Sequence, residues 1–396
     1  MLAARLRTAL ARLLRRPPSD WMGPDRALLP ASRAARFARE DRHEVVALPG
    51  TPAGPLLRLA AQGHRVFAVS PRASDAGRPY ALSETSPGFF EVALPAARFE
   101  GLDALRRDRG LGATVCVVPD PSWLPLAEEL SAKLNWPIAR EASGDLAAAF
   151  PLLSIVVVTY GNRELNRLCL ESLFARTEWP HREILVVDNG STDGTRELLA
   201  ETAGRHPDLR TILFDENRGF PAAANAGLAR AAGRYLVLLN NDTVVTRGWA
   251  TALARHLALN PRLGLIGPAT NAIANEARVD AGYAGLDGLA SWAAGRVRAH
   301  DGVTFPIPSL AFFCVAMRRD VHDAVGPLDE RFGIGMFEDG DYCRRVRAQG
   351  LELACASDAF VHHWQMASFR RLGRDAYTRL FEENRRKFEE KWGAGP

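Results

Sequence analysis

No stretch of this 396-residue sequence is long and apolar enough to predict a transmembrane helix. Such a helix needs about 20 consecutive apolar residues to cross the hydrocarbon core of a bilayer. The longest apolar runs, Tyr235–Leu239 and Ala311–Met317, have only the length of a β-strand. The pattern therefore argues against a protein held in the membrane by a helix of its own.

Cysteine is also scarce, with five residues, an odd number, and no C-x-x-C pair. This usage excludes a disulfide-stapled scaffold and a zinc ribbon, because both need paired cysteines at regular spacing. Cys314 and Cys355 lie in apolar runs and are typical of reduced thiols in a core. We therefore expect a protein of a reducing compartment, the cytoplasm.

A strong excess of one charge is missing as well. The 50 Lys and Arg residues face 46 Asp and Glu residues, which leaves a net charge of only +4. Because the basic residues are dispersed, the charge pattern does not predict a nucleic-acid partner. Hydrophobic residues make up 47% and charged residues 24%, a composition typical of globular domains rather than disordered chains.

The first 16 residues form a distinct basic segment without any acidic side chain. Leucines recur there at helical spacing, and Pro17–Pro18 ends the predicted helix. We assign residues 1–44 to this amphipathic helix and a linker. The helix is either a peripheral contact with the inner face of the plasma membrane or simply an exposed terminal helix. Its arginines are Arg5, Arg7, Arg12, Arg15 and Arg16.

Residues 45–150 are predicted to form a small α/β, Rossmann-like accessory domain. Val45–Leu48 and Arg65–Val69 have the pattern of short strands separated by a turn and a helix, which is one βαβ unit. A further strand is expected at Ala113–Val118, followed by a helix at Trp123–Leu134. The glycines of the first turn are explained by a tight turn as well as by a nucleotide loop.

A second α/β domain is predicted over residues 151–370, followed by a basic C-terminal helix over 371–396. The run Leu152–Thr159 is continuously apolar and β-branched, as expected for a parallel strand buried on both faces. Strand and helix patterns then alternate, which indicates an open, mostly parallel sheet flanked by helices. The further strands are expected at Glu183–Val187, Thr211–Phe214, Arg234–Leu239 and Ala359–Val361, and the helices at Glu164–Ala175 and Ala222–Ala232.

Polar side chains gather where three of these strands end, at Thr159–Asn162, Asp188–Thr195 and Asn240–Asp242. Each group alone is typical of an ordinary turn, since turns favour Asn, Asp, Gly and Ser. The carboxyl ends of parallel strands, however, meet at one edge of the sheet, where ligands bind in such folds. The three groups together therefore predict a single polar site.

The motifs SIVVVTYGN, EILVVDNGSTDGT, ENRGFPAAANAGLARAAGRYLVLLNND and GIGMFEDGDYCRR resemble family 2 glycosyltransferases of the GT-A fold. The resemblance runs from about Leu152 to the C-terminus, including NRRKFEEKWG, and a rhamnosyltransferase-like branch is the nearest. It implies an inverting, metal-dependent transfer of a sugar from a nucleotide-diphosphate donor. The acceptor would be a hydroxyl of a polysaccharide or a lipid-linked saccharide. Separately, Val117–Pro137 weakly resembles the N-terminal lobe of GT-B glycosyltransferases.

The resemblance also implies which residues bind the donor. Thr159 would lie near the base and ribose, and Asp188 would accept a hydrogen bond from the base. Asn217 and Arg218 precede a helix whose N-terminus can face the phosphates. Asn241, at the third strand end, completes the group.

Asp242 occupies the last position of the family's metal-binding D-x-D element, in which Asn240 replaces the first aspartate. Oxygen ligands suit Mg²⁺ or Mn²⁺, and such a cation stabilises the charge on a departing nucleoside diphosphate. The other interpretation of Asp242 is a helix N-cap. A histidine near the end of Ala359–Val361 would be a further ligand; its spacing to Ser368 favours His363 over His362 without deciding between them.

The acidic group Glu338, Asp339 and Asp341 matches the family's acid/base element. An inverting transfer needs one carboxylate to take the proton of the acceptor hydroxyl, and the resemblance assigns this role to Asp339. Glu338 would contact the acceptor or support Asp339. Acids at the start of a helix also interact favourably with its dipole, which accounts for the same residues without catalysis.

Two other functions remain open at this point. A non-catalytic scaffold derived from a glycosyltransferase would keep the fold and bind sugar or a partner, but the presence of Asp188, Asp242 and Asp339 argues against it. A sugar-nucleotide nucleotidylyltransferase would need a glycine-rich phosphate loop with a basic residue near its N-terminus. Residues 159–163 lack such a loop.

Overall fold

The computed structural model describes residues 44–61, 64–70, 80–87, 89–94, 99–109, 114–118, 120–139, 150–364 and 374–393. The predicted amphipathic helix and its linker, assigned to residues 1–44, fall outside these ranges except for Glu44. Within the described ranges, no helix is both long and apolar enough to cross a membrane. All five cysteines are buried and unpaired with one another, as their apolar surroundings predict.

The first domain is built on a six-stranded sheet in the order β3-β4-β2-β1-β5-β6. Its centre is β1 (Glu44–Ala47), fully buried and paired in parallel with β2 (Arg65–Ser70) and β5 (Thr114–Val117). These three strands are the predicted ones. The other elements are α3 (Ala53–Ala61), β3 (Ala81–Ser86), β4 (Phe89–Ala93), α4 (Phe99–Arg109), the 3₁₀ turn η3 (Pro121–Trp123), α5 (Leu124–Leu134) and β6 (Ile138–Ala139).

The hairpin of β3 and β4 was not predicted. Its first strand has the sequence ALSETS, and three of its residues are exposed. An edge strand with so few buried side chains has no alternating apolar pattern to reveal it, because its stability comes from pairing with β4 rather than from burial.

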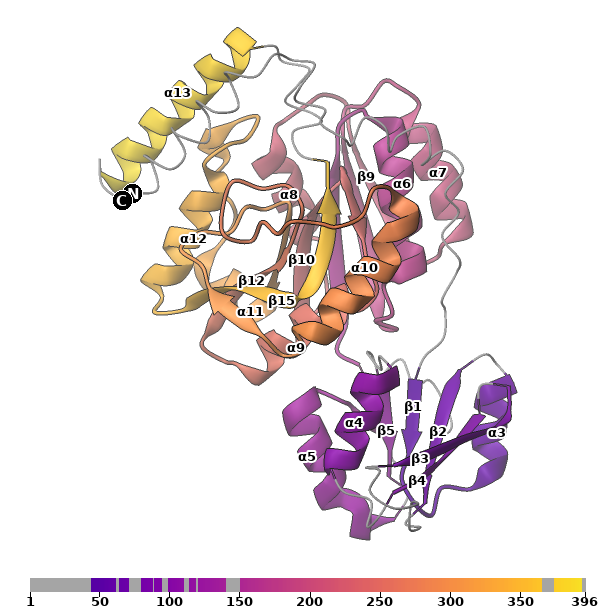
Figure 1. Cartoon of the computed structure of the whole chain (residues 1–396). Coiled ribbons are helices and arrows are strands. Elements are labelled where there is room, and N and C mark those ends of the chain that lie inside the picture. Colours follow the sequence, from indigo (N-terminus) through magenta and orange to yellow (C-terminus); the bar gives the residue numbers. More distant parts are fainter. Residues whose placement is uncertain are drawn as a thin grey trace.

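The second domain contains a nine-stranded sheet whose main path is β11-β15-β12-β14-β10-β7-β8-β9 (Figure 1). The apolar run forms β7 (Leu153–Thr159), which lies in parallel between β8 (Arg182–Asn189) and β10 (Tyr235–Asn240). All seven residues of β7 are buried, as a central strand requires. The remaining strands are β9 (Leu209–Phe214), β11 (Thr243–Val245), β12 (Leu263–Ala269), β13 (Thr304–Pro306), β14 (Cys314–Arg318) and β15 (Glu352–His363).

The sheet is parallel from β10 to β9 and mixed beyond β10. Strand β14 runs antiparallel to both β10 and β12, whereas β12 and β15 are parallel. Strand β15 has 12 residues rather than the short stretch expected at Ala359–Val361. Buried Ser357 and Asp358 interrupt its apolar pattern. The buried carboxylate of Asp358 is tolerated because it forms hydrogen bonds with Arg255, His256 and the amide of Gly302.

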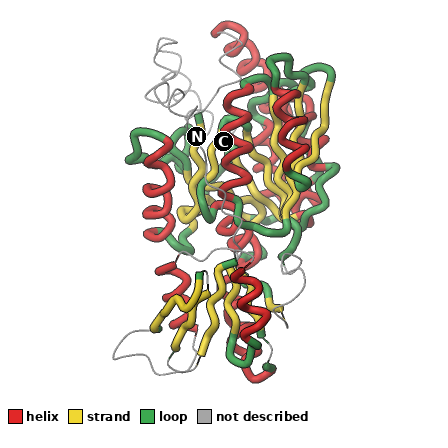
Figure 2. The backbone as a smooth tube through the Cα atoms, turned by 90° about the vertical axis from the view of Figure 1, so that its right-hand side faces the viewer, coloured by secondary structure: helices red, strands yellow, loops and turns green. Residues whose placement is uncertain are grey.

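Helices cover both faces of this sheet, as the α/β class predicts (Figure 2). Ile155 and Val157 of β7 face a core shared with α6, α7 and α9, while Val156 and Val158 face one shared with α8, α10 and α12. The alternation follows from the pleat of a strand, which points successive side chains to opposite faces. The helices are α6 (Arg163–Arg176), α7 (Thr195–Arg205), α8 (Phe220–Leu228), α9 (Trp249–Leu259), α10 (Leu286–Ala299), α11 (Arg319–Val325), the 3₁₀ turn η5 (Glu330–Phe332), α12 (Glu338–Ala348) and α13 (Arg374–Trp392).

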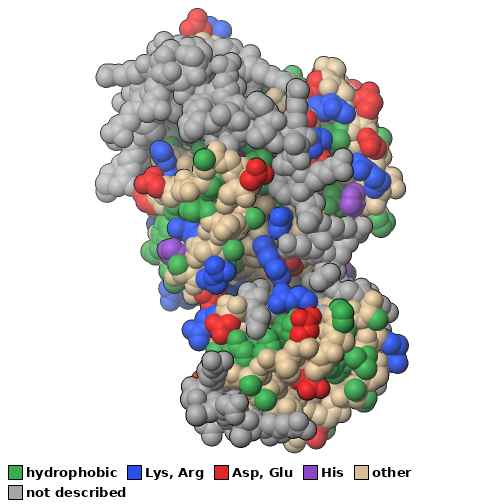
Figure 3. Space-filling view, turned by 45° about the vertical axis from the view of Figure 1, so that its right-hand side comes forward, with side chains coloured by type: hydrophobic (Ala, Val, Ile, Leu, Met, Phe, Trp, Pro, Cys, Tyr) green, Lys and Arg blue, Asp and Glu red, His purple; other side chains and the backbone are tan. Residues whose placement is uncertain are grey.

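Ion pairs join the two domains. Arg106 of α4 binds Asp301 with an Nη1–Oδ1 distance of 2.9 Å, and Arg247 reaches the buried Glu44 of β1 at 3.1 Å. Acidic and basic side chains are visible where the two lobes meet in Figure 3. Because Glu44 is the first residue of β1, the amino end of this strand faces the second domain.

Candidate active site

The ends of β7 and β8 are joined through the side chain of Asp188. Thr159 Oγ1 donates a hydrogen bond to Asp188 Oδ1 at 3.0 Å, and both residues are fully buried. Ser191 donates its amide to Asp188 Oδ2 at 3.0 Å, and Arg196 Nε reaches the same oxygen at 3.2 Å. Asp188 thus orders the loop after β8. Its predicted bond to a nucleotide base stays a prediction, as does the contact of Thr159.

The loop before α8 is held by Asn189, a residue that the sequence reasoning did not select. Its Nδ2 donates to Asn217 Oδ1 at 2.8 Å, and its Oδ1 accepts from the amide of Arg218 at 2.8 Å. The side chains of Asn217 and Arg218 are exposed, and the Arg218 guanidinium lies over the ring of Phe214 at 4.6 Å. Asn189 therefore presents both predicted donor-binding residues at the edge where β8 ends.

Asn241 connects the third strand end to the first. Its Nδ2 donates to Asn166 Oδ1 at 2.5 Å, and Asn166 Nδ2 donates to the carbonyl of Gly161 at 2.9 Å. The three polar groups predicted at separate strand ends therefore form one connected edge. Asn241 is 6% exposed, so its main contact in this structure is with the protein.

Asp242 and His363 lie next to each other at the same edge, with Asp242 Oδ1 3.3 Å from His363 Nε2. His363 Nδ1 lies 3.0 Å from the carbonyl oxygen of Ala272. Since a carbonyl oxygen only accepts hydrogen bonds, Nδ1 carries a hydrogen, and Nε2 is the ring nitrogen that faces the carboxylate. Asn271 fixes the backbone of His363 by bonds of 2.9 and 3.1 Å.

This arrangement fits a divalent cation. One carboxylate oxygen and one imidazole nitrogen converge, and the imidazole is oriented by a carbonyl, as is typical of metal-binding histidines. Among the described residues, no group of three or more His, Cys, Asp or Glu side chains is close enough to hold a metal by itself. A cation here would therefore need further oxygen ligands from substrate or water.

His362 points elsewhere. Its Nδ1 lies 2.6 Å from the hydroxyl oxygen of Tyr283, and its ring packs edge-on against Trp364 at 4.5 Å. Burial lowers the pKa of His362 to about 3, so this ring is neutral. The structure therefore places His363, and not His362, beside Asp242.

The acidic group at the start of α12 divides into two environments. Glu338 is 8% exposed, and within the described part of the chain its Oε2 has no hydrogen-bond partner. Burial raises the pKa of Glu338, with a further contribution from the charge of Asp339. Burial likewise raises the pKa of the half-buried Asp339, whose Oδ1 accepts from the amide of Gly340 at 2.7 Å.

Asp341 has a different role from its two neighbours. It is fully buried, and its carboxylate accepts from Arg345 Nε at 2.9 Å and from Trp392 Nε1 at 2.8 Å. Lys391 Nζ lies 2.7 Å from Asp341 Oδ1, the oxygen that also accepts from Trp392. These contacts join α12 to α13, so Asp341 stabilises the fold around the acidic pair Glu338 and Asp339.

A close backbone contact holds the loop before the acidic pair against the start of α8. The amide of Phe220 donates to the carbonyl of Ile334 at 3.2 Å, so the loop before α12 packs on the start of α8. Gly219 has a φ of +88°, and a Cβ there would lie 1.9 Å from the carbonyl oxygen of Gly333. Only glycine permits this approach.

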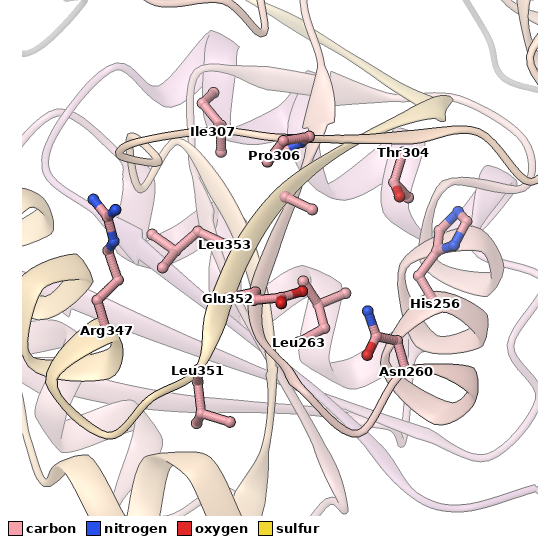
Figure 4. A pocket seen from close by; sticks show the side chains of 11 residues that line it. His256, Asn260, Leu263, Thr304, Pro306, Ile307, Arg347, Leu351, Glu352 and Leu353 are labelled. Carbon is pink, nitrogen blue, oxygen red and sulfur yellow. The ribbon is translucent and has the colours of Figure 1, made fainter.

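A separate hollow of about 490 Å³ lies away from these residues (Figure 4). Its lining includes Leu263 and Glu352, the first residues of β12 and β15, together with His256 and Arg347. None of the predicted site residues lines it. It opens at the amino ends of two parallel strands, whereas the polar groups gather at carboxyl ends, where ligands bind in such sheets.

Part of the chain is similar to known proteins. Residues 154–326 match the family model described as Glycosyl transferase family 2. These residues form a domain that belongs to glycosyltransferase family 2. The family 2 domain contains the connected edge from Thr159 to Asp242, and its sheet flanked by helices is the GT-A arrangement that the resemblance implied. The acidic pair and His363 follow beyond residue 326.

Several curated proteins are similar to part of this chain. The O-antigen biosynthesis protein RfbC of Myxococcus xanthus is 32% identical over 230 residues, covering 56% of this chain and 18% of RfbC. The pre-mycofactocin glycosyltransferase of Mycobacterium tuberculosis is 30% identical over 184 residues, covering 46% of this chain and 37% of that protein. This chain therefore spans well under half the length of either relative.

Two solved structures of glycosyltransferases are similar in part. The mannosyltransferase PcManGT from Pyrobaculum calidifontis, in complex with GDP-Man and Mn²⁺, has 19% identity and a TM-score of 0.42 over 72% of this chain and 71% of its own. GalNAc-T7 with UDP, GalNAc and Mn²⁺ has 16% identity and a TM-score of 0.44 over 62% of this chain and 52% of its own.

Proposed function

We propose that this protein transfers a sugar from a nucleotide-diphosphate donor to a hydroxyl of a polysaccharide or lipid-linked acceptor, with inversion and with Mg²⁺ or Mn²⁺. The observation that carries the proposal is the pair Asp242 and His363, 3.3 Å apart at the strand edge of the family 2 domain. A carboxylate oxygen and an imidazole nitrogen at this separation are ligand types that a divalent cation can share. Polysaccharide biosynthesis is the setting suggested by the name of RfbC.

The donor would bind along the edge formed by β7, β8 and β10. Asp242 and His363 would hold the cation, whose chemistry when bound is to stabilise the negative charge on the departing diphosphate. Arg218 and Asn217, exposed at the start of α8, would add a positive charge and a helix N-terminus toward the phosphates. Thr159 and Asp188 keep this edge in one conformation.

Asp339 would remove the proton from the acceptor hydroxyl while the hydroxyl oxygen attacks the anomeric carbon of the donor sugar. The two neighbouring carboxyls differ in environment, since Glu338 is the more buried and its pKa is also raised by the charge of Asp339. The pair therefore holds a single negative charge most readily on Asp339. Attack from the face opposite the diphosphate inverts the configuration in one step.

The pH dependence of transfer follows from these environments. Because burial raises the pKa of Asp339, the base becomes protonated at a higher pH than an ordinary carboxyl, whose pKa is about 4. We expect the acid limb of the kcat/KM profile to have its midpoint more than one pH unit above about 4. Initial rates measured between pH 4 and 9, with protein stability checked at each pH, test this. A midpoint at about 4 would contradict the assignment.

A thermal-shift panel of UDP, GDP, dTDP and CDP, each with and without Mn²⁺, tests the proposed function. We expect one nucleotide to stabilise the protein only when Mn²⁺ is present. Ligand at a hundredfold excess over its dissociation constant stabilises the native state by about 2.7 kcal/mol, a readily visible shift. Absence of any shift would argue for a non-catalytic scaffold. The matching sugar nucleotide would then be assayed for release of its nucleoside diphosphate.

A further inference from the structure

The loop that leads to the acidic pair has an unusual backbone. Gly335, Met336 and Phe337 follow one another with φ values of +138°, +79° and +74°, and Gly333 has a φ of +58°. Left-handed conformations are strongly disfavoured for residues with a Cβ, above all for bulky ones. Two such residues directly before Glu338 persist only where the surroundings hold them. The loop therefore needs an external support.

The side chain of Asn384, in α13, provides that support. It is fully buried, and its Nδ2 lies 2.7 Å from the carbonyl of Phe332, 2.8 Å from that of Gly335 and 3.3 Å from that of Met336. Its Oδ1 accepts from Lys387 Nζ at 3.2 Å. A single amide group thus binds backbone carbonyls on both sides of the turn at Gly333.

Other residues of α13 hold the loop and the start of α12 from the same side. The ring of Phe337 packs against Phe381 at 5.1 Å and against Phe388 at 5.5 Å. Lys391 and Trp392 bind the buried carboxylate of Asp341. Helix α13 accordingly lies beside α12 in Figure 1. The acidic pair stands between these two sets of contacts.

We propose that Asn384 is a positioning residue for Glu338 and Asp339, and that α13 acts as the template that keeps their loop in its left-handed form. This inference rests on the proposed function for its catalytic consequence, but not for its structural one. The amide suits this position because the three acceptors are carbonyl oxygens, and its NH₂ group supplies two hydrogen-bond donors. A carboxylate of the same size would instead repel them.

Asn384→Asp in the full chain is the direct test. With the donors lost, the loop relaxes and Asp339 moves relative to the acceptor, so kcat is expected to fall about 100-fold, as displacements near 1 Å do. Mn²⁺-dependent nucleotide affinity and donor KM are expected to stay within about twofold, since Asp242 and His363 are not touched. The matched control is Arg386→Gln on the same helix, where the side chain is 71% exposed; it should behave as the wild type.

Hydrogen–deuterium exchange of the same proteins provides a readout that does not depend on activity. The amides of residues 333–337 should exchange faster in Asn384→Asp than in the wild type or in Arg386→Gln, with β7 and β8 unchanged. Asn384→Gln keeps the amide but places it on a longer side chain, and it replaces Asn384→Asp in the test if the aspartate variant does not fold. We expect it to speed the exchange of residues 333–337 less than Asn384→Asp would.

The outcomes separate the two proposals. Unchanged exchange in the loop, or a loss of kcat accompanied by an equal loss of nucleotide affinity, would overturn the positioning role. A wild type without transferase activity would defeat the proposed function, while faster exchange confined to residues 333–337 would still establish the support by Asn384. Faster exchange together with a selective fall in kcat would establish both.

Discussion

Asp339→Asn is expected to lower kcat by about 1000-fold while leaving nucleotide binding nearly unchanged. Removing a general base typically costs 100- to 10,000-fold, and the amide is close in size to the carboxylate but cannot take a proton. Asp339 is half-buried at the start of α12, and its Oδ1 accepts a hydrogen bond from the amide of Gly340, which the asparagine oxygen can still accept. Steady-state transfer rates and Mn²⁺-dependent nucleotide affinity, measured on the same preparation, test this.

The control for Asp339 is Asp320→Asn in α11, whose carboxylate is 73% exposed and bonded to Arg318. It should retain full activity. Glu338→Gln should be milder than Asp339→Asn, because a glutamine resembles the protonated form that burial favours. Normal turnover by Asp339→Asn would remove this residue as the base, and a greater loss in Glu338→Gln would transfer the role to its neighbour.

Asp242→Ala is expected to weaken Mn²⁺-dependent nucleotide binding at least 100-fold. Loss of its carboxylate removes the only acidic side chain that contacts His363 in the described structure. The remaining imidazole is a poor site for a hard cation by itself. Calorimetric titration of nucleotide at several Mn²⁺ concentrations measures the effect. The exposed Asp287→Asn on α10 is the matched control.

The adjacent histidines supply a second control for the metal. His363→Gln should weaken Mn²⁺-dependent binding in the same direction as Asp242→Ala. His362→Phe should leave it unchanged, since that ring packs against Trp364 and its Nδ1 lies beside the Tyr283 hydroxyl rather than Asp242. The ligand assignment would be wrong if His362→Phe weakened Mn²⁺-dependent binding as much as His363→Gln. It would also be wrong if Asp242→Ala bound nucleotide and Mn²⁺ like the wild type.

Much of the second domain could be predicted from local pattern. The run that became β7 is buried at every position, so its composition alone required a central strand. The turn residues after β7, β8 and β10 predicted the polar edge, because parallel strands bring their carboxyl ends together. The family resemblance then assigned chemistry to Asp242 and Asp339. The edge strand β3 escaped prediction because it has few buried side chains. The length of β15 escaped it because the buried Asp358 is satisfied by partners distant in sequence.

The sequence by itself determined the α/β class, the alternation of strands and helices from β7 to β10, and the edge at which the polar residues meet. These follow from burial and periodicity, which are local properties of the chain. Only the tertiary structure decided that His363 rather than His362 faces Asp242, since neighbouring residues of a strand point to opposite faces. It also decided the contact of Asn384 with Gly335, 49 residues earlier. Such pairs depend on how helices pack against loops, and no local pattern encodes that packing.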